Sequence, residues 1–263
     1  MIKTIAVLIT CISTALYTVI FGIPVVLTAP FSKTGRFPYK FCRGWSWIVL
    51  KTNRVRIQVV GREKLSNDHS YVFMSNHASN LDPPAVALSL KHTLRFVAKR
   101  SLARIPLFGI AIRLARMIII DRNNALSSHA AVNSAVSDLT RGVSAFFFAE
   151  GTRSLDGTLQ NFKKGGVLLA MKTRLPIVPV TIVGSHDLWP KKTFQIKPGV
   201  VKVIIGDPID TSEYTEKERD VVLERVRSVI SANLAGQPGG DRYGASLKVI
   251  CNESNPSLMV RCT

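Results

Sequence analysis

The segment Ser75-Asn76-His77-Ala78-Ser79-Asn80-Leu81-Asp82 places a histidine and an aspartate five residues apart. It directly follows the apolar stretch Tyr71 to Met74, which predicts a strand. A turn over this spacing lets the Asp82 carboxylate accept a hydrogen bond from one imidazole nitrogen of His77, which leaves the other nitrogen as a general base. The alternative is a loop histidine beside an aspartate that caps the helix opened by the two following prolines.

A second group of reactive side chains follows the apolar stretch Ser144 to Phe148. Glu150, Gly151, Thr152 and Arg153 occur there in succession. A guanidinium at the end of a strand can hold a phosphate through paired hydrogen bonds. The alternative is a surface turn with a local ion pair.

Two further cations come directly after predicted strands. Lys99 follows Leu94 to Ala98, and Arg122 lies just beyond Met117 to Ile120. Sites in open α/β sheets form outside the carboxyl ends of the strands. Lys99, Arg122 and Arg153 therefore converge on one anion if their strands are neighbours.

These segments belong to a chain in which strands and helices alternate. The other predicted strands cover Val55 to Val60, Ile177 to Val183 and Val200 to Ile205, and the predicted helices cover Pro83 to Leu90, Ile105 to Ala115, Ala125 to Leu139, Gly165 to Thr173 and Glu216 to Leu234. Such alternation predicts an α/β fold with a mixed, largely parallel sheet flanked by helices. We expect an amino-terminal anchor in residues 1–54, an α/β domain in residues 55–235 and a loose tail in residues 236–263.

The amino terminus is strongly apolar, with no charged side chain from Thr4 to Ser32. As a helix of about 1.5 Å per residue this stretch is about 43 Å long, enough to cross a bilayer core of about 30 Å. Gly22-Ile23-Pro24 interrupts it, because proline removes a helix hydrogen bond. We therefore predict a membrane anchor, either a kinked span or a re-entrant segment, with a cleaved signal peptide as the alternative.

The charge balance indicates an anionic partner, since 35 Lys plus Arg face 17 Asp plus Glu and the net charge is +18. Most of the surplus lies between Lys33 and Arg122, directly after the anchor. Positive flanks favour the cytoplasmic side and are attracted to anionic lipid. The aromatic and basic stretch Phe37 to Leu50 predicts an interfacial helix, with an ordinary packed helix as the alternative. We expect the protein on the cytoplasmic face of the inner membrane, bound to anionic lipid.

Composition argues against several other classes of protein. An apolar fraction of 46 % is too high for general disorder. The cysteines form no CxxC pair, which argues against a disulfide scaffold and a metal site; they are Cys11, Cys42, Cys251 and Cys262. There is no Gly-x-Ser-x-Gly nucleophile motif. A net charge of +18 permits nucleic-acid binding, but no helix-turn-helix, RNP or zinc-finger signature accompanies it.

Five sequence blocks, in this order, resemble the glycerolipid acyltransferases. They are Asn-His-x4-Asp at 76–82, Lys-x2-Leu-x3-Pro-x2-Gly at 99–109, Ile-Asp-Arg-Asn-Asn at 120–124, Phe-x-Glu-Gly-Thr-Arg-Ser at 148–154 and Leu-Pro-Ile-Val-Pro-Val at 175–180. The resemblance covers roughly Val55 to Ile209. It looks closest to the bacterial type of 1-acylglycerol-3-phosphate acyltransferase.

This resemblance implies transfer of a fatty acyl group from acyl-CoA or acyl carrier protein to the 2-hydroxyl of lysophosphatidic acid, forming phosphatidic acid. It implies no cofactor, no metal and no covalent acyl-enzyme. It makes His77 the general base and Asp82 its orienting carboxylate. Arg122 and the run from Glu150 to Arg153, that is Glu150, Gly151, Thr152 and Arg153, fall in acceptor-binding blocks.

The second block departs from the usual family pattern. It usually has a glycine five residues before its aspartate and a phenylalanine two before it, where this chain has Arg116 and Ile119. The departure bears on the local backbone and on acceptor preference. Three rival functions stay open: acylation of another acceptor (glycerol-3-phosphate or a lyso-aminolipid), thioester hydrolysis by His77 and Asp82, and membrane-anchored nucleic-acid binding.

Overall fold

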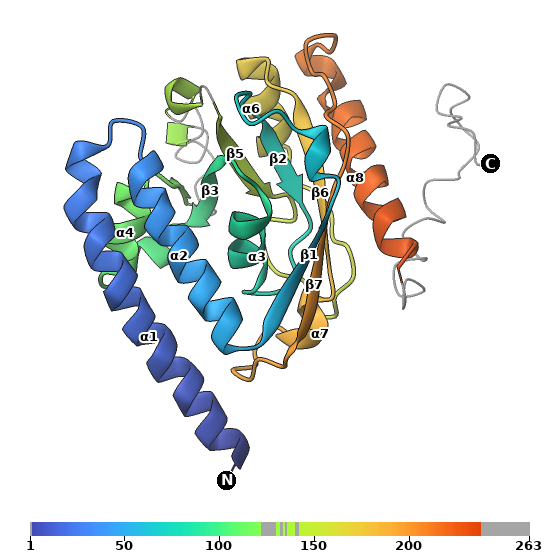
Figure 1. Cartoon of the computed structure of the whole chain (residues 1–263). Helices are drawn as coiled ribbons and strands as arrows, with labels where there is room; N and C mark the ends of the chain where they lie inside the picture. Colours follow the sequence, from blue (N-terminus) through green and yellow to red (C-terminus); the bar gives the residue numbers. More distant parts are fainter. Residues whose placement is uncertain (1, 122–129, 132–133, 135, 140–141, 238–263) are drawn as a thin grey trace.

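A central sheet with helices on both faces organises the chain (Figure 1). The computed structural model describes residues 2–121, 130–131, 134, 136–139 and 142–237. The strands, in spatial order, are β1 (Val55–Val60), β7 (Gly199–Ile205), β6 (Ile177–Val183), β2 (Val72–Ser75), β5 (Val143–Phe148), β3 (Thr93–Lys99) and β4 (Ile118–Ile120). Neighbouring strands are parallel except β6 and β7, which are antiparallel. The predicted mixed, largely parallel α/β sheet is confirmed.

The described helices are α1 (Ile2–Thr28), α2 (Arg36–Thr52), α3 (Asp82–Ser89), α4 (Phe108–Leu114), α6 (Gly165–Thr173), α7 (Ser185–Leu188) and α8 (Arg219–Ala235). Helices α3, α4, α6 and α8 lie close to the ranges that the sequence predicts, whereas α7 was not predicted. Short 3-10 turns are η1 (Ala29–Phe31), η2 (Arg62–Lys64), η3 (Leu102–Arg104), η4 (Val136–Asp138) and η5 (Glu216–Glu218). Most of the predicted helix Ala125 to Leu139 and nearly all of the predicted tail lie outside the described residues.

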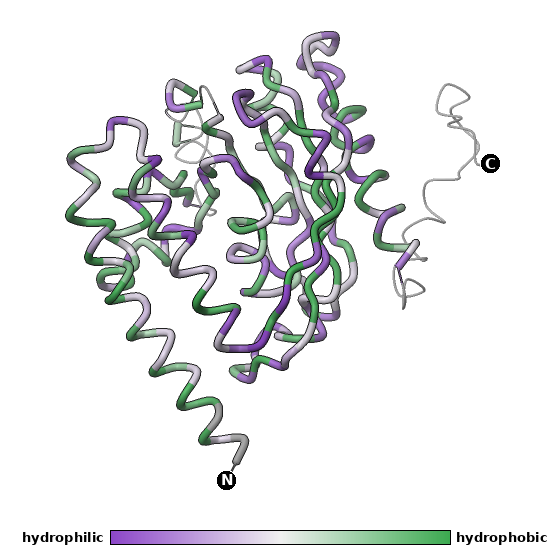
Figure 2. Tube along the Cα trace, in the orientation of Figure 1, coloured by the Kyte–Doolittle hydropathy of each residue, from purple (hydrophilic) through white to green (hydrophobic). Residues whose placement is uncertain are grey.

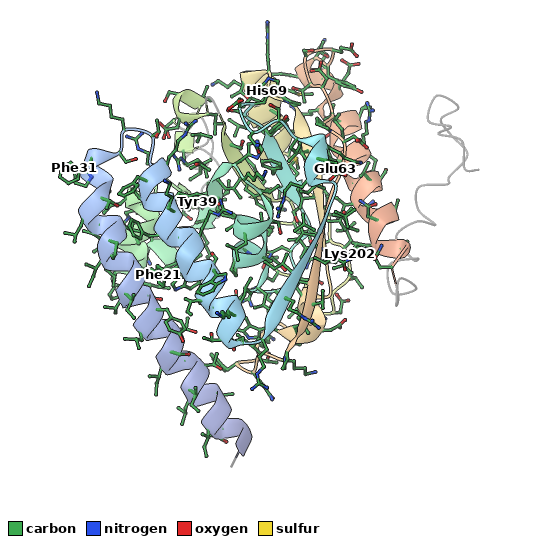
Figure 3. All side chains as sticks on the ribbon, viewed as in Figure 1. Phe21, Phe31, Tyr39, Glu63, His69 and Lys202 are labelled. Carbon is green, nitrogen blue, oxygen red and sulfur yellow. The ribbon has the colours of Figure 1, made fainter. Side chains whose placement is uncertain are left out.

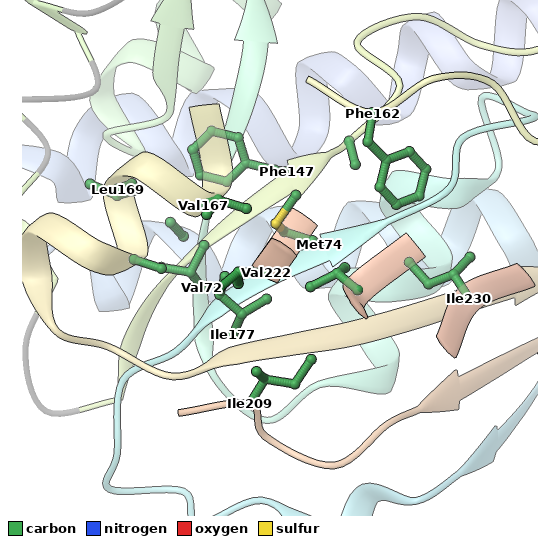
Figure 4. Close-up of a cluster of buried hydrophobic side chains, with 14 of the residues drawn as sticks. Val72, Met74, Phe147, Phe162, Val167, Leu169, Ile177, Ile209, Val222 and Ile230 are labelled. Carbon is green, nitrogen blue, oxygen red and sulfur yellow. The ribbon is translucent and has the colours of Figure 1, made fainter. Parts of the chain in front are cut away.

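The sheet is buried on both faces because its strands are apolar on both sides. Along β2, Val72 and Met74 belong to one hydrophobic core and Phe73 to the other. The first core lies between the sheet, α6 and α8, where Met74 and Phe147 approach one another (Figure 4). The second core lies between the sheet, α2 and α3. The hydropathy tube shows the apolar run of the central strands (Figure 2).

α1 is one helix from Ile2 to Thr28 and passes through Pro24. The predicted interruption at Gly22-Ile23-Pro24 is therefore wrong. A proline inside a helix costs roughly 3 kcal/mol, and packing offsets this cost here because Gly22 and Val25, on either side of Pro24, are buried. The stretch Val7–Phe31 is long and apolar enough to cross a membrane by length and composition.

α2 covers the stretch Phe37 to Leu50, for which the sequence allows an interfacial helix or an ordinary packed helix. Its inner face packs on α3, β1 and β3 and buries Tyr39 and Leu50. Its outer face exposes Phe37 and Trp47. It is a packed helix whose exposed side carries aromatic residues.

Candidate active site

The residues of the first and fourth sequence blocks meet at the centre of the sheet. β2 and β5 are neighbouring parallel strands in which Ser75 pairs with Phe148. The loops that follow them therefore leave the same edge of the sheet side by side. This register brings His77 to the turn that begins at Glu150.

His77 and Asp82 form a buried hydrogen-bonded pair. His77 Nδ1 lies 2.8 Å from Asp82 Oδ2, with 14 % of the His77 side chain exposed and none of the Asp82 side chain. A carboxylate oxygen accepts hydrogen bonds, so Nδ1 carries the hydrogen and Nε2 keeps a free lone pair. The geometry therefore leaves Nε2 able to act as a base.

The Asp82 carboxylate folds back onto its loop. Its Oδ2 also accepts hydrogen bonds from the backbone N–H groups of Ala78 and Ser79, each at 2.8 Å. α3 begins at Asp82 and has no side-chain cap. The capping role suggested by the following prolines is therefore wrong, because three donors upstream of the helix already engage this oxygen.

Phe148 fixes the plane of the His77 ring. The two rings stack with centroids 3.9 Å apart and an interplanar angle of 22°. Sequence reasoning includes Phe148 in the fourth block but gives it no role. The only sequence signal is its position as the last residue of a strand next to the site.

Glu150 holds the backbone of His77. Its Oε1 accepts the His77 N–H at 2.6 Å, and its Oε2 accepts the Gln160 N–H at 3.2 Å. On the other side of the loop, the Ser154 N–H donates to the His77 carbonyl at 2.9 Å. Burial raises the pKa of the Glu150 carboxyl to about 8, although the two amide donors lower it.

The turn after Glu150 needs a residue in the left-handed region. Gly151 supplies it with φ +72°. Thr152 is exposed and Arg153 is half-buried. Burial lowers the pKa of the Arg153 guanidinium and the Asp82 carboxylate raises it.

Lys191 is a cation of this turn that sequence reasoning did not single out. Its Nζ donates to the Arg153 carbonyl at 2.8 Å and lies 3.4 Å from Thr152 Oγ1. It follows β6, the neighbour of β2 on the side opposite β5. α7 separates Lys191 from the end of β6, so the criterion that selects Lys99, a cation directly after a strand, does not find it.

The other two predicted cations are Lys99 and Arg122. Lys99 is the last residue of β3, and its exposed side chain borders the same cavity as His77. Arg122 lies outside the described residues. Lys99 thus lies by the cavity and Arg153 on the turn bonded to His77, while the predicted convergence of all three cations stays a prediction.

A largely apolar cavity of about 250 Å³ extends from His77 between α1, α2, β3 and α4. Its wall includes Phe21, Val25, Trp45 and Phe96. Figure 3 shows two of its side chains, Phe21 on α1 and Tyr39 on α2. The cavity joins a basic nitrogen to a space suited to hydrocarbon.

Arg116 stands where the usual family pattern has a glycine, and its backbone adopts a conformation that favours glycine. Arg116 has φ +58°, in the left-handed region that favours glycine. Its guanidinium forms an ion pair with Asp138 at 2.8 Å. The arginine thus keeps the conformation that a glycine would adopt here.

The chain is similar in sequence to known acyltransferases. A family model described as Acyltransferase matches residues 56–183. A 1-acyl-sn-glycerol-3-phosphate acyltransferase of Limnanthes douglasii is 37 % identical over 62 % of this chain and 58 % of its own length. The human 1-acyl-sn-glycerol-3-phosphate acyltransferase alpha is 30 % identical over 71 % of this chain and 68 % of its own length.

A solved structure shares the fold along nearly the whole chain. The crystal structure of PlsC, the 1-acyl-sn-glycerophosphate (LPA) acyltransferase of Thermotoga maritima, aligns with a TM-score of 0.73 at 23 % identity, over 96 % of this chain and 98 % of that one. The chain spans less than two thirds of the length of the Limnanthes relatives. The human relative is covered more completely. From these matches the chain belongs to the acyltransferase family that includes the 1-acyl-sn-glycerol-3-phosphate acyltransferases.

Proposed function

We propose that this protein transfers a fatty acyl group from an acyl thioester to the 2-hydroxyl of 1-acylglycerol-3-phosphate, forming phosphatidic acid. The observation that carries the proposal is the His77–Asp82 pair, 2.8 Å apart, at an apolar cavity in a chain of the acyltransferase family. The names of its relatives supply the acceptor. Acyl-CoA and acyl carrier protein are the two candidate donors, and no metal or cofactor takes part.

His77 is the general base of the proposed reaction. Its Nε2 takes the proton of the acceptor hydroxyl while the oxygen attacks the thioester carbonyl, and the new ester bond replaces the carbon–sulfur bond. The departing thiolate takes the proton from the imidazolium. General-base help of this kind contributes roughly 10²- to 10⁴-fold. Asp82 stabilises the imidazolium and keeps the proton on Nδ1.

Cations near the turn bind the acceptor phosphate in this proposal. Arg153, Lys191 and Lys99 form no ion pair with a carboxylate in the part of the chain that the structure describes. A guanidinium suits a phosphate because it donates two parallel hydrogen bonds. Thr152 adds a hydroxyl, and Arg122 keeps its proposed place in acceptor binding.

Glu150 does not bind the acceptor in this proposal, although the family resemblance places it in an acceptor-binding block. Both of its carboxylate oxygens are engaged by backbone amides of the protein. The residue is 4 % exposed. We propose that Glu150 is a positioning residue that acts on the reaction through the His77 loop.

The protein works at a membrane in this proposal. α1 supports membrane association by its length and composition. The cavity beside α1 takes the acyl chain of the thioester, and the basic residues after α1 favour anionic lipid and the cytoplasmic face.

The test uses the purified protein in mixed micelles with lysophosphatidic acid and an acyl thioester. The wild-type protein forms phosphatidic acid, and the His77→Ala variant loses at least a hundredfold of this rate. His69→Ala is the matched control, because His69 is exposed and outside the site. A folded His77→Ala protein with full activity would overturn the assignment.

A panel of acceptors separates the remaining functions. Lysophosphatidic acid, glycerol-3-phosphate and a lyso-aminolipid are offered to the same preparation, with acyl-CoA and acyl carrier protein donors in turn. Preference for lysophosphatidic acid supports the proposal. Equal thioester cleavage without any acceptor indicates a hydrolase instead.

A further inference from the structure

One face of the molecule combines exposed apolar side chains with cations and contains no carboxylate. It is formed by α1, η1 and α2 together with η3 and α4, that is by residues 2–52 and 102–114, and we refer to it as the acid-free face. No Asp or Glu occurs anywhere in residues 1–62 or 83–120. Surfaces that face water normally mix charges of both signs. The acid-free face is therefore unusual for a surface in contact with water.

Exposed apolar residues on this face are not confined to α1. Leu102, Ile105 and Ile110 of the η3–α4 segment are 40 %, 47 % and 48 % exposed. These fractions fall at the lower end of those on α1, where Val19 is 45 % and Ile12 is 66 % exposed. Two segments far apart in the sequence thus both present apolar side chains at the surface.

The two segments are in contact. A Cβ atom on Gly22 of α1 would lie 3.1 Å from Cγ of Leu107, closer than an ordinary van der Waals contact, so the lack of a side chain at residue 22 favours this close approach. Ile110 and Leu114, four residues apart, share one face of α4. α1 and α4 pack against each other. Figure 1 shows α4 beside α1 and α2.

The position of α1 on the domain determines what enters a membrane with it. Its candidate span, Val7–Phe31, includes the stretch that packs on the domain. In that stretch the Thr18 hydroxyl accepts a hydrogen bond from Trp45 Nε1 at 3.2 Å, and Val25 is buried. Insertion of the span therefore brings the neighbouring surfaces of α2 and α4 to the bilayer as well.

Charge complementarity indicates the kind of lipid. On the outer face of α2, the Lys51 ammonium lies 4.4 Å from the centre of the Trp47 ring, an aromatic and basic pairing suited to the headgroup region. On the η3–α4 segment, Arg104 and Arg113 are exposed. Neither forms an ion pair within the described residues.

We propose that the η3–α4 segment, residues 102–114, is a second membrane-contacting element, which inserts Ile105 and Ile110 into an anionic lipid interface next to α1. A membrane contact through α1 alone leaves the domain, together with α1, free to rotate about the axis of that helix. A second contact from a distant part of the chain fixes the orientation of the domain. This orientation turns the cavity between α1 and α4 toward the bilayer.

The experiment measures the depth of probes on the full chain and needs no activity, so it is independent of the proposed function. Cys11, Cys42, Cys251 and Cys262 are replaced by alanine or serine. An environment-sensitive fluorophore is then attached in separate variants at Ile105→Cys and Ile110→Cys. The matched control is Val221→Cys, because Val221 is 51 % exposed but lies on α8, across the sheet from α1 (Figure 1).

Each labelled protein is reconstituted with vesicles of phosphatidylcholine and phosphatidylglycerol. We expect a blue-shifted emission, quenched by brominated acyl chains, from the probes at 105 and 110 and none from the probe at 221. Water-like emission at 105 and 110, together with a lipid signal from a probe at Leu16→Cys on α1, would overturn the proposal.

Two further variants keep the test decisive. If the cysteine-free protein does not fold, Ile105→Trp in the unmodified chain should add tryptophan fluorescence that brominated lipid quenches, and an unquenched increment counts against the proposal. The double variant Arg104→Ala, Arg113→Ala should weaken the lipid signal at 110 only in vesicles with phosphatidylglycerol, by about fivefold per arginine. An unchanged signal there would refute the requirement for anionic lipid.

Discussion

Replacing Asp82 by asparagine changes a charge while keeping the shape of the side chain. The amide oxygen of asparagine can still accept the hydrogen bonds that Oδ2 accepts from Ala78, Ser79 and the His77 ring. The NH₂ group then occupies the place of Oδ1, which is buried without a partner among the described residues. The loop therefore survives, and what is lost is the negative charge beside the imidazolium.

The size of the effect follows from the 2.8 Å contact. A hydrogen bond to a charged group contributes about 1.5 kcal/mol at the low end. A full pair of charges about 4 Å apart at an effective dielectric constant of about 20 contributes at most about 4 kcal/mol. Since about 1.4 kcal/mol corresponds to a factor of ten, kcat should fall between roughly tenfold and a thousandfold.

Steady-state kinetics with lysophosphatidic acid and an acyl thioester measure this loss. It should appear in kcat with KM nearly unchanged, because the imidazolium forms only as the reaction proceeds. In the His77→Ala background the additional loss from Asp82→Asn should nearly vanish, since Asp82 acts through His77. A folded Asp82→Asn protein with kcat within about twofold of wild type, or losses that multiply in the double variant, would refute the reasoning.

Three further predictions concern Glu150, Lys191 and Arg116. Burial raises the pKa of the Glu150 carboxyl to about 8, so the folded protein holds a proton that the unfolded chain releases near pH 4.5. The free energy of unfolding should therefore fall, on the order of a few kcal/mol, as the pH rises from about 4.5 to about 8. Glu150→Gln should flatten that slope in thermal unfolding, and an equal slope would contradict the assigned burial. Lys191→Ala should raise KM for lysophosphatidic acid roughly tenfold or more, whereas Lys197→Ala, an exposed control, should not; equal KM values would remove Lys191 from the phosphate site. Arg116→Gly should stay within about 1 kcal/mol of wild-type stability, but Arg116→Val should lose about 1–3 kcal/mol because a β-branched residue is strained at φ +58°; equal melting temperatures would show that the turn can relax.

The strands and the helices around the site were predictable because the signals that define them are local. Alternating apolar stretches bounded by Gly, Pro and Asn specify the strands from β1 to β7 within a few residues. The rule that sites form at the carboxyl ends of strands singles out His77 and the turn from Glu150 to Arg153. The contact of His77 with Asp82 also depends on short-range geometry, since five residues separate them.

Other features were decided by which segments lie next to one another in three dimensions. The carboxylate of Glu150 points to the His77 amide because β2 and β5 pair in register, and no local pattern encodes that pairing. Lys191 reaches the same turn only because β6 lies beside β2.

In the amino-terminal half, too, some features follow from the sequence alone and others only from the tertiary structure. Composition alone determined that the amino terminus is a long apolar segment followed by a surplus of cations. Only the tertiary structure decided that α1 continues through Pro24, because burial of Gly22 and Val25 against the domain outweighs the local preference of proline. The cavity at His77 is likewise assembled from α1, α2, β3 and α4. Its shape depends on long-range packing, which the periodicity of a single segment does not contain.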